Sequence, residues 1–136
     1  MNILERIVAD KRVEVDLKKS VLPLDYLRNS PMIEREVFSL RESLQKGSGI
    51  IAEFKRRSPS KQVINQKSGV AEVVTGYQAA GASGNTVLTD TKYFGGSLDD
   101  LLQARAAVEI PVLRKDFMID PYQLFEAKAF GADVIL

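Results

Sequence analysis

The stretch IIAEFKRRSPSK, residues 50–61, decides the fold of this chain. Residues 50–55 are apolar at nearly every position until a charged end, which is typical of a strand buried in a parallel sheet. A long polar loop follows it. Residues 68–81 then carry apolar side chains at helical spacing, and we expect Ser68 to cap this helix and Gly81 to close it. The stretch thus begins a strand–loop–helix unit.

This unit recurs toward the end of the chain. Strands are predicted at residues 86–89 and 112–115, helices at 97–106 and 120–130, and the start of a fourth strand at 134–136. Strands that alternate with amphipathic helices form a parallel sheet, either doubly wound or part of a (β/α)8 barrel. The loops after the strands are longer than the loops before them, and both architectures place active sites at the carboxyl ends of the strands.

The first 48 residues follow a different pattern. Residues 2–19 predict an amphipathic helix that Asn2 and Glu5 cap together. A short helix is predicted at residues 23–28, and another that ends at Gly47. We therefore divide the chain into an N-terminal helical extension, residues 1–48, and a (βα)3β segment, residues 49–136.

Composition excludes several kinds of chemistry in these 136 residues. The chain has no cysteine and no histidine, which excludes a thiolate nucleophile, a Ser–His–Asp triad and a metal site built on either residue. Acid–base catalysis must then use Lys, Glu, Asp or Tyr. A net charge of +1 gives no reason to expect nucleic acid or an anionic membrane as a partner. No apolar run approaches the ~20 residues that span a bilayer, so we expect a cytoplasmic protein.

Charged side chains at the predicted strand ends are the first candidates for chemistry. Glu53 and Lys55 lie two apart on one strand, so they share a face, which in a barrel is the floor of the active site. Lys55 suits an anionic group and Glu53 suits the orientation of that ammonium, although a solvated ion pair is an equal alternative. Lys115 closes the third strand as a candidate general acid or base. The alternative is a plain charged strand end, with Arg114 and Asp116 facing solvent.

Two loops supply candidate binding groups. Residues 56–61 hold three cations and two hydroxyls, which suit a carboxylate or a phosphate, and an exposed basic loop is the alternative. Residues 93–96, Tyr-Phe-Gly-Gly, predict a mobile loop whose aromatic side chain covers a pocket. A turn with a partly buried Phe94 is the alternative there.

Taken together, these motifs resemble the indole-3-glycerol-phosphate synthase family over the whole chain. The first 48 residues resemble the family's N-terminal extension, which packs over the mouth of the barrel. The resemblance implies an α/β fold, a partial (β/α)8 TIM barrel with a helical extension followed by about (βα)3β. The segments that match the family's first four strands and their loops are residues 51–61, 87–90, 92–97, 111–117, 120–123 and 131–133.

The resemblance also implies an activity. The family is a decarboxylating carbon–carbon lyase of tryptophan biosynthesis, which closes a ring in 1-(2-carboxyphenylamino)-1-deoxyribulose 5-phosphate and uses neither cofactor nor metal. By this resemblance Lys115 is the general acid, Lys55 binds anionic groups of the phosphorylated substrate, and Glu53 positions Lys55 and polar substrate atoms. The implied substrate-binding residues, at the anthranilate carboxylate and around the aromatic ring, are Ser58, Phe94 and Phe117.

Three features depart from the family pattern. Gln62 stands where the family usually has glycine. Asn85 stands where an aliphatic residue is usual, and alternation from Thr86 turns it toward the helices, so we expect a buried amide there unless the strand starts later. The third departure is length, because a barrel takes about 250 residues. A catalytic glutamate on the fifth strand, an asparagine on the sixth and the phosphate loops after the seventh and eighth are therefore missing.

We accordingly expect the chain to be inactive by itself. The main alternative is a non-catalytic half-barrel, which self-associates through its open edges or needs a complementary half. Another phosphate-binding barrel enzyme is a third interpretation, which the motifs around Glu53 and Lys115 disfavour.

Overall fold

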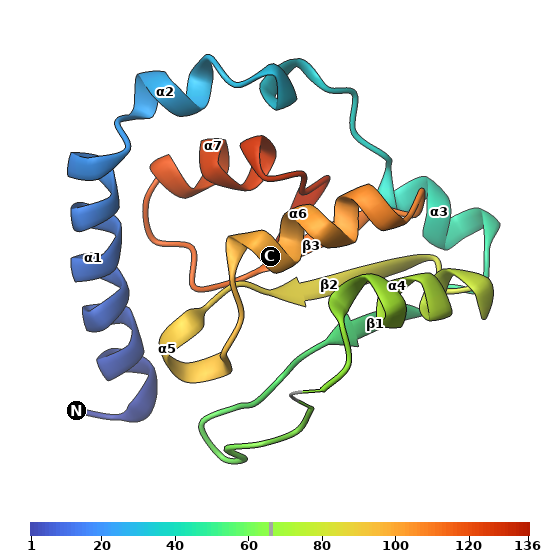
Figure 1. Cartoon of the computed structure of the whole chain (residues 1–136), viewed down its shortest axis with the longest axis horizontal. Helices are drawn as coiled ribbons and strands as arrows, with labels where there is room; N and C mark the ends of the chain where they lie inside the picture. Colours follow the sequence, from blue (N-terminus) through green and yellow to red (C-terminus); the bar gives the residue numbers. More distant parts are fainter. Residues whose placement is uncertain (66) are drawn as a thin grey trace.

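The computed structural model describes residues 1–65 and 67–136, and a parallel sheet of four strands lies at the centre of this part (Figure 1). A doubly wound sheet reverses its strand order at a switch point, whereas this sheet keeps the chain order that a barrel has. The fold is therefore α/β with the architecture of a partial TIM barrel. The strands, in order, are β1 (Ile51–Phe54), β2 (Gly84–Leu88), β3 (Val112–Lys115) and β4 (Val134–Ile135).

Helices cover one face of the sheet and form the main core with it. Phe54, Val87 and Val112 project from three strands into this core, and Val74 and Leu101 are buried against them. Each of these five side chains is at most 3% exposed. The helices that connect successive strands and contribute to this layer are α4 (Val70–Ala79), α6 (Leu98–Ala107) and α7 (Tyr122–Ala129).

The register of the sheet sets which side chains share the opposite face. Glu53 on β1 pairs with Thr86 on β2, which pairs with Leu113 on β3. Leu88 pairs with Lys115 two residues further along the strands. Since neighbouring partners in a sheet point the same way, Glu53 and Lys115 lie on one face, at the carboxyl ends of β1 and β3.

The N-terminal extension runs around the edge of the α/β part (Figure 1). The predicted capping box is confirmed, because the Asn2 side chain accepts from the Glu5 N–H while the Glu5 carboxylate accepts from the Asn2 N–H. The short helix at residues 23–28 and the helix that ends at Gly47 are confirmed as well. The elements are α1 (Ile3–Val21), α2 (Leu24–Arg28), a 3-10 turn (Pro31–Glu34) and α3 (Leu40–Lys46).

Buried contacts join the extension to the rest of the chain at two places. Val15 of α1 and Leu27 of α2 pack with Tyr122 of α7, and all three are 2% exposed. At the other end of the sheet, the buried carboxylate of Asp133 accepts from Arg35 at 2.9 Å. The extension is thus anchored at both ends of the sheet, and the division of the chain at residue 48 stays a prediction.

One predicted helix cap is wrong. The Ser68 side chain does not cap α4, which begins at Val70 after Gly69 without a side-chain cap. The reason lies in the preceding turn, where the Asn65 side chain accepts from the Ser68 N–H at 3.1 Å. Ser68 therefore lies before the helix, which starts later than the sequence indicates.

At residues 93–96 the structure has a compact turn with a partly buried Phe94, which confirms the alternative to a mobile loop. It includes a short helix, α5 (Thr91–Phe94), which Asp90 caps by accepting from the Tyr93 N–H. Gly95 ends this helix in the left-handed region, at φ 68°. A Cβ on Gly96 would lie 1.9 Å from the Leu88 carbonyl oxygen. The two glycines therefore allow the chain to close tightly against β2.

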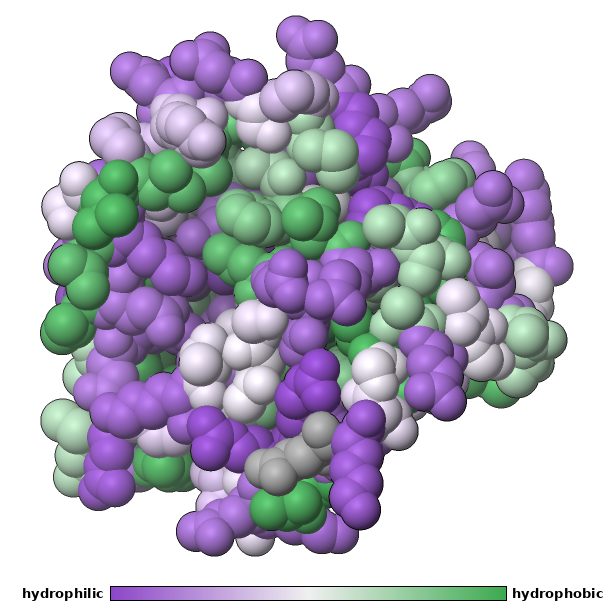
Figure 2. Space-filling model, in the orientation of Figure 1, coloured by the Kyte–Doolittle hydropathy of each residue, from purple (hydrophilic) through white to green (hydrophobic). Residues whose placement is uncertain are grey.

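Apolar side chains also lie on the outer surface of the extension. Val13, Leu17 and Val21 follow one another at helical spacing along α1 and are 70%, 64% and 75% exposed. Figure 2 shows hydrophobic surface along this helix. Over the described ranges, no helix combines the length and the apolarity that a membrane crossing needs.

Asn85 is buried on the helix-facing side of β2, as its position in the strand predicts. It lies between Ala52 and Val112 in the register and is 1% exposed. Both its amide nitrogen and its amide oxygen are buried without a hydrogen-bond partner. The strand begins at Gly84, so the alternative of a later start is excluded. A buried amide without partners costs free energy that an apolar side chain does not.

The substitution Asn85→Val should therefore stabilise the chain. We expect the free energy of unfolding to rise by about 1–2 kcal/mol, because the unpaired amide is removed and a β-branched side chain suits a buried strand. Urea unfolding at neutral pH measures this change. Gln62→Val, at an exposed loop position, is the matched control and should leave the unfolding midpoint nearly unchanged. A loss of stability in Asn85→Val would show that the amide has a partner in solution.

Candidate active site

One carboxylate lies between two ammonium groups at the carboxyl ends of β1 and β3. Lys115 Nζ donates to Glu53 Oε1 at 2.7 Å, and Lys55 Nζ lies 3.3 Å from Glu53 Oε2. The Thr86 hydroxyl also donates to Glu53 Oε1, at 3.4 Å. The three charged side chains are 30–40% exposed. The structure thus brings together the three residues that the sequence proposed as catalytic.

The surroundings of Glu53 favour its ionised form. Burial raises the pKa of this carboxyl group, but the hydrogen bond from Lys115 and the charges of Lys115 and Lys55 outweigh burial and lower it below the ordinary value. Glu53 is therefore a carboxylate at neutral pH. It can accept hydrogen bonds from both lysines and so orient their side chains.

An apolar hollow lies beside Lys115. The rings of Phe94 and Phe117 are 6.0 Å apart, centroid to centroid. Together with Leu88 and Lys115 they line a cavity of about 160 Å³. A flat apolar group in this hollow would lie next to an ammonium group that Glu53 holds from the other side.

Ser58 lies in a different, more polar hollow. Its backbone N–H donates to the Lys61 carbonyl oxygen at 2.8 Å, which closes a tight turn in the loop after β1. Its side chain faces a cavity that Arg57, Lys92 and Tyr93 also line. The contacts of this turn do not bring Ser58 to the pair of phenylalanine rings.

Two of the three cations in this loop hold neighbouring elements. The Arg56 guanidinium makes two hydrogen bonds to the Asp100 carboxylate, at 3.0 and 3.1 Å, and so ties the loop to the start of α6. The Arg57 guanidinium donates to the carbonyl oxygens of Thr91 and Lys92. Both arginines thus hold neighbouring elements in place, and anion binding by this loop stays a prediction.

Arg114 and Asp116 are buried, so the alternative in which they face solvent is excluded. Each side chain is 1% exposed. Arg114 alternates with the inward Lys115 and therefore enters the helix layer, where its guanidinium pairs with Glu126 of α7 at 2.8 Å. It also lies 3.2 Å from Asp116 and donates to the Thr89 hydroxyl. Each buried charge thus faces a charge of opposite sign.

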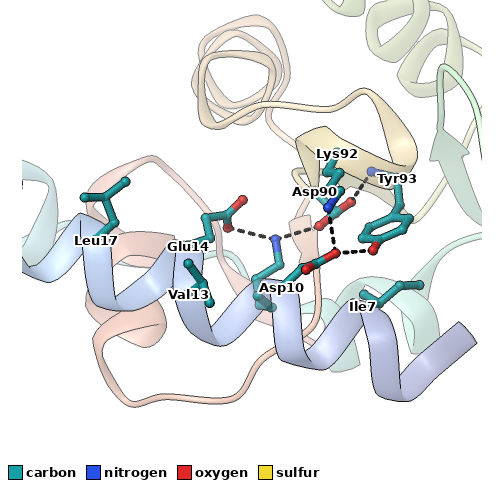
Figure 3. Close-up of a pocket in the computed structure, with 9 residues that line it drawn as sticks. Ile7, Asp10, Val13, Glu14, Leu17, Asp90, Lys92 and Tyr93 are labelled. Atoms are coloured by element: carbon teal, nitrogen blue, oxygen red, sulfur yellow. Dashed lines mark hydrogen bonds and ion pairs between the residues drawn. The ribbon is translucent and has the colours of Figure 1, made fainter. Parts of the chain in front are cut away.

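The extension completes this charge network through residues that the sequence did not single out. Lys11 of α1 is 2% exposed, and its ammonium lies 2.6 Å from Asp90 and 3.1 Å from Asp116. Figure 3 shows Glu14 and Asp10 on the same helix, turned toward Asp90 and Tyr93. Asp10 accepts hydrogen bonds from Lys92, at 2.7 Å, and from the Tyr93 hydroxyl.

A signal for Lys11 was present in the sequence. It stands four residues after Ile7 and four before Val15, and these three residues form the buried stripe of α1. A lysine at the centre of an apolar stripe predicts a buried carboxylate partner elsewhere, since an unpaired buried charge is very costly. The partners themselves lie about 80 and 105 residues away, and no local pattern identifies them.

The substitution Asp116→Asn tests the energetic weight of this network. Burial raises the pKa of Asp116, but the charges of Lys11 and Arg114 outweigh it, so the pKa lies below the ordinary value in the folded chain. Its ionisation therefore stabilises the fold above about pH 4 and is lost as the pH falls through the lowered pKa. We expect Asp116→Asn to lower the free energy of unfolding by about 3 kcal/mol at pH 7. The stability of this variant should also fall less than that of the parent chain as the pH is lowered.

Urea unfolding from pH 7 down to about pH 3 measures both effects of Asp116→Asn. Asp16→Asn, at an exposed position of α1, is the control and should follow the parent chain throughout. A stability for Asp116→Asn equal to that of the parent at pH 7 would contradict the proposed weight of the network.

Comparisons with known proteins identify the family. A sequence model described as indole-3-glycerol phosphate synthase matches residues 4–136. A protein of that name from Bacteroides thetaiotaomicron is 49% identical over 136 residues, covering 99% of this chain and 52% of the relative. Its counterparts from Laribacter hongkongensis and Azospirillum brasilense are 43% and 45% identical, with 99% of this chain and 53% of each relative covered. The chain spans about half the length of these relatives, and it belongs to the indole-3-glycerol phosphate synthase family.

Proposed function

We propose that this chain carries the first part of an active site for indole-3-glycerol phosphate synthesis. The substrate is 1-(2-carboxyphenylamino)-1-deoxyribulose 5-phosphate, and the reaction is a ring closure with loss of carbon dioxide and water. The observation that carries the proposal is the Glu53 carboxylate between Lys55 and Lys115, beside the Phe94–Phe117 hollow. We place this activity in the cytoplasm, because charges on a phosphorylated substrate hinder its passage through membranes.

Each group has a role that follows from its surroundings. The ring carbon that bears the carboxylate forms a bond to the ketone carbon of the sugar chain, and the carboxylate leaves as carbon dioxide. The ketone oxygen takes up a proton and becomes a hydroxyl as the ring closes. Lys115 donates a second proton, so that the hydroxyl leaves as water, and the methylene carbon next to the nitrogen loses a proton as the ring double bond forms. Lys55 balances the negative charge of the substrate, and Glu53 holds both ammonium groups in place. The aromatic ring of the substrate packs against Phe94 and Phe117 in the hollow that they line beside Lys115.

Ser58 is proposed at the anthranilate carboxylate, and this contact requires the loop after β1 to close toward Phe94 and Phe117, because the carboxylate is bonded to the ring that these residues contact. Its hollow is polar, and Arg57 and Lys92 contribute positive charge to its lining, which suits an anionic group. The hydroxyl of Ser58 is available as a donor, since its hydrogen rotates freely about the C–O bond.

A fusion protein tests the proposed activity. Residues 1–136 are joined to the part of the Bacteroides thetaiotaomicron relative that lies beyond the matched region, and formation of indole-3-glycerol phosphate is followed by fluorescence. We expect turnover in the fusion protein and none in the 136-residue chain alone, because the chain spans about half of such a relative. The substitution Lys115→Met should lower kcat by about a thousandfold, because it removes the proton donor.

Lys46→Met is the matched control for Lys115→Met. Lys46 ends α3 and is exposed, so this variant should keep the activity of the parent fusion. A folded fusion protein without activity, or Lys115→Met with the kcat of the parent, would refute the proposed role.

Self-association is a second candidate property of the isolated chain. In the described sheet β1 and β4 are edge strands, and Ile51 and Ile135 on them are 42% and 40% exposed. Unpaired strand edges with exposed apolar side chains favour pairing with another chain. The apolar side of α1 formed by Val13, Leu17 and Val21 adds to this exposed surface (Figure 2).

Light scattering over a range of protein concentrations tests this second property. We expect the apparent mass of the 136-residue chain to rise above 15.1 kDa as concentration increases. Ile51→Lys places a charge on the edge strand, so the apparent mass of this variant should begin to rise only at a higher protein concentration. A constant monomer mass up to the highest soluble concentration would argue against self-association.

A further inference from the structure

We propose that Lys11 is a positioning residue for the synthase reaction: its buried ammonium fixes Asp90 and Asp116, and through them the segments that carry Phe94 and Lys115. The inference deepens the proposed function and rests on it. Lys11 touches none of the groups assigned to the substrate, so it acts through its two carboxylate partners.

The ammonium of Lys11 is shared among two buried carboxylates, those of Asp90 and Asp116, and the partly exposed carboxylate of Glu14. It lies 2.6 Å from Asp90, 3.1 Å from Asp116 and 2.8 Å from Glu14. The side chains of Lys11, Asp90 and Asp116 are at most 2% exposed. Charge-assisted hydrogen bonds in such surroundings are directional and strong, so the position of Nζ determines where both aspartates lie.

Asp90 connects Lys11 to the aromatic hollow. One oxygen of its carboxylate faces Lys11, and the other accepts from the Tyr93 N–H at 2.8 Å. This second bond caps α5, and Phe94 is the last residue of that helix. A rotation of the Asp90 carboxylate would therefore loosen the helix that presents Phe94 to the hollow.

Asp116 connects Lys11 to the candidate acid. It follows Lys115 directly, and its Oδ1 both faces Lys11 and accepts from the Phe117 N–H at 2.7 Å. Its other oxygen accepts from the Thr89 hydroxyl at 2.6 Å. The carboxylate thus holds the backbone on the far side of Lys115, which fixes the direction in which the lysine side chain leaves the strand.

Removal of the Lys11 charge has a defined consequence. Asp90 and Asp116 would remain buried near one another as like charges, and mutual repulsion would turn one or both away. Arg114 still balances Asp116, whereas the ion pair that the structure gives Asp90 is the one to Lys11. We expect the α5 segment to loosen most, followed by the end of β3.

Kinetics of the fusion protein test the catalytic part. In Lys11→Met we expect kcat to fall about tenfold or more, with KM changed by less than about threefold, because a misplaced acid slows chemistry more than it weakens binding. Lys11→Arg keeps the charge and should recover part of the lost kcat. Lys19→Met is the matched control, since Lys19 lies on the same helix and pairs with Asp120 at an exposed site, and it should stay within about twofold of the parent.

Hydrogen exchange on the 136-residue chain tests the structural part without any activity. The amides of Tyr93 and Phe117 report on the carboxylates of Asp90 and Asp116, and in Lys11→Met they should exchange at least about tenfold faster than in Lys19→Met. If Lys11→Met does not fold, the double variant Lys11→Met/Asp90→Asn takes its place, because it removes one buried charge of each sign. The same changes in kcat and in amide exchange rate are expected for it.

The outcomes separate this inference from the proposed function. Three results would overturn the positioning role. They are a kcat of Lys11→Met equal to that of the parent, a loss of kcat in Lys19→Met as large as that in Lys11→Met, and exchange rates of the Tyr93 and Phe117 amides that do not change. A fusion protein that is folded but inactive refutes the proposed function, and the exchange rates alone then decide whether Lys11 holds the two aspartates.

Discussion

The Asp116 carboxylate is the point at which three parts of the molecule meet. It lies between the guanidinium of Arg114, which belongs to the sheet and faces the helix layer, and the ammonium of Lys11, which belongs to the extension. A buried carboxylate is tolerated when opposite charges and hydrogen bonds replace water, and the Thr89 hydroxyl and the Phe117 N–H complete its set of partners. One side chain therefore links the sheet to the extension directly and to the helix layer through Arg114, in addition to the contacts that anchor the extension elsewhere.

Side chains alternate in direction along β3, so that adjacent residues serve the candidate site and the buried ion network. Lys115 points to the open face, where it meets Glu53, and Arg114 points into the helix layer, where it meets Glu126. The same geometry makes the strand end sensitive, because a shift of one position in register would exchange the two faces. The buried pairs oppose such a shift, since a misplaced Arg114 would leave Glu126 buried without its guanidinium partner.

Much of the fold could be predicted from the sequence, because the apolar periodicity of the strands and helices is local. The same alternation that identified β2 also placed Asn85 in the helix layer, and it grouped Glu53 with Lys55 on the open face. Local patterns failed where a distant group decides the outcome. The basic run after β1 does not reveal that Arg56 pairs with Asp100, 44 residues away. The two glycines after Phe94 allow a loop or a turn, and the close approach of the second glycine to the backbone of β2 decides for the turn.

A buried ion network is weak evidence for stability, because desolvation of the charges offsets much of their attraction. Its better-supported effect is to select one packing arrangement, since each buried charge has an oppositely charged partner in only a few arrangements. An apolar side chain at position 11 could pack against the carboxyl ends of the strands in several rotations of α1. The ammonium of Lys11 allows the rotation in which both Asp90 and Asp116 are within reach. Lys11 thereby fixes the extension against the carboxyl ends of two strands, and the nearby residues Phe94 and Lys115 line the same hollow. One lysine thus couples the position of α1 to the geometry of the candidate site.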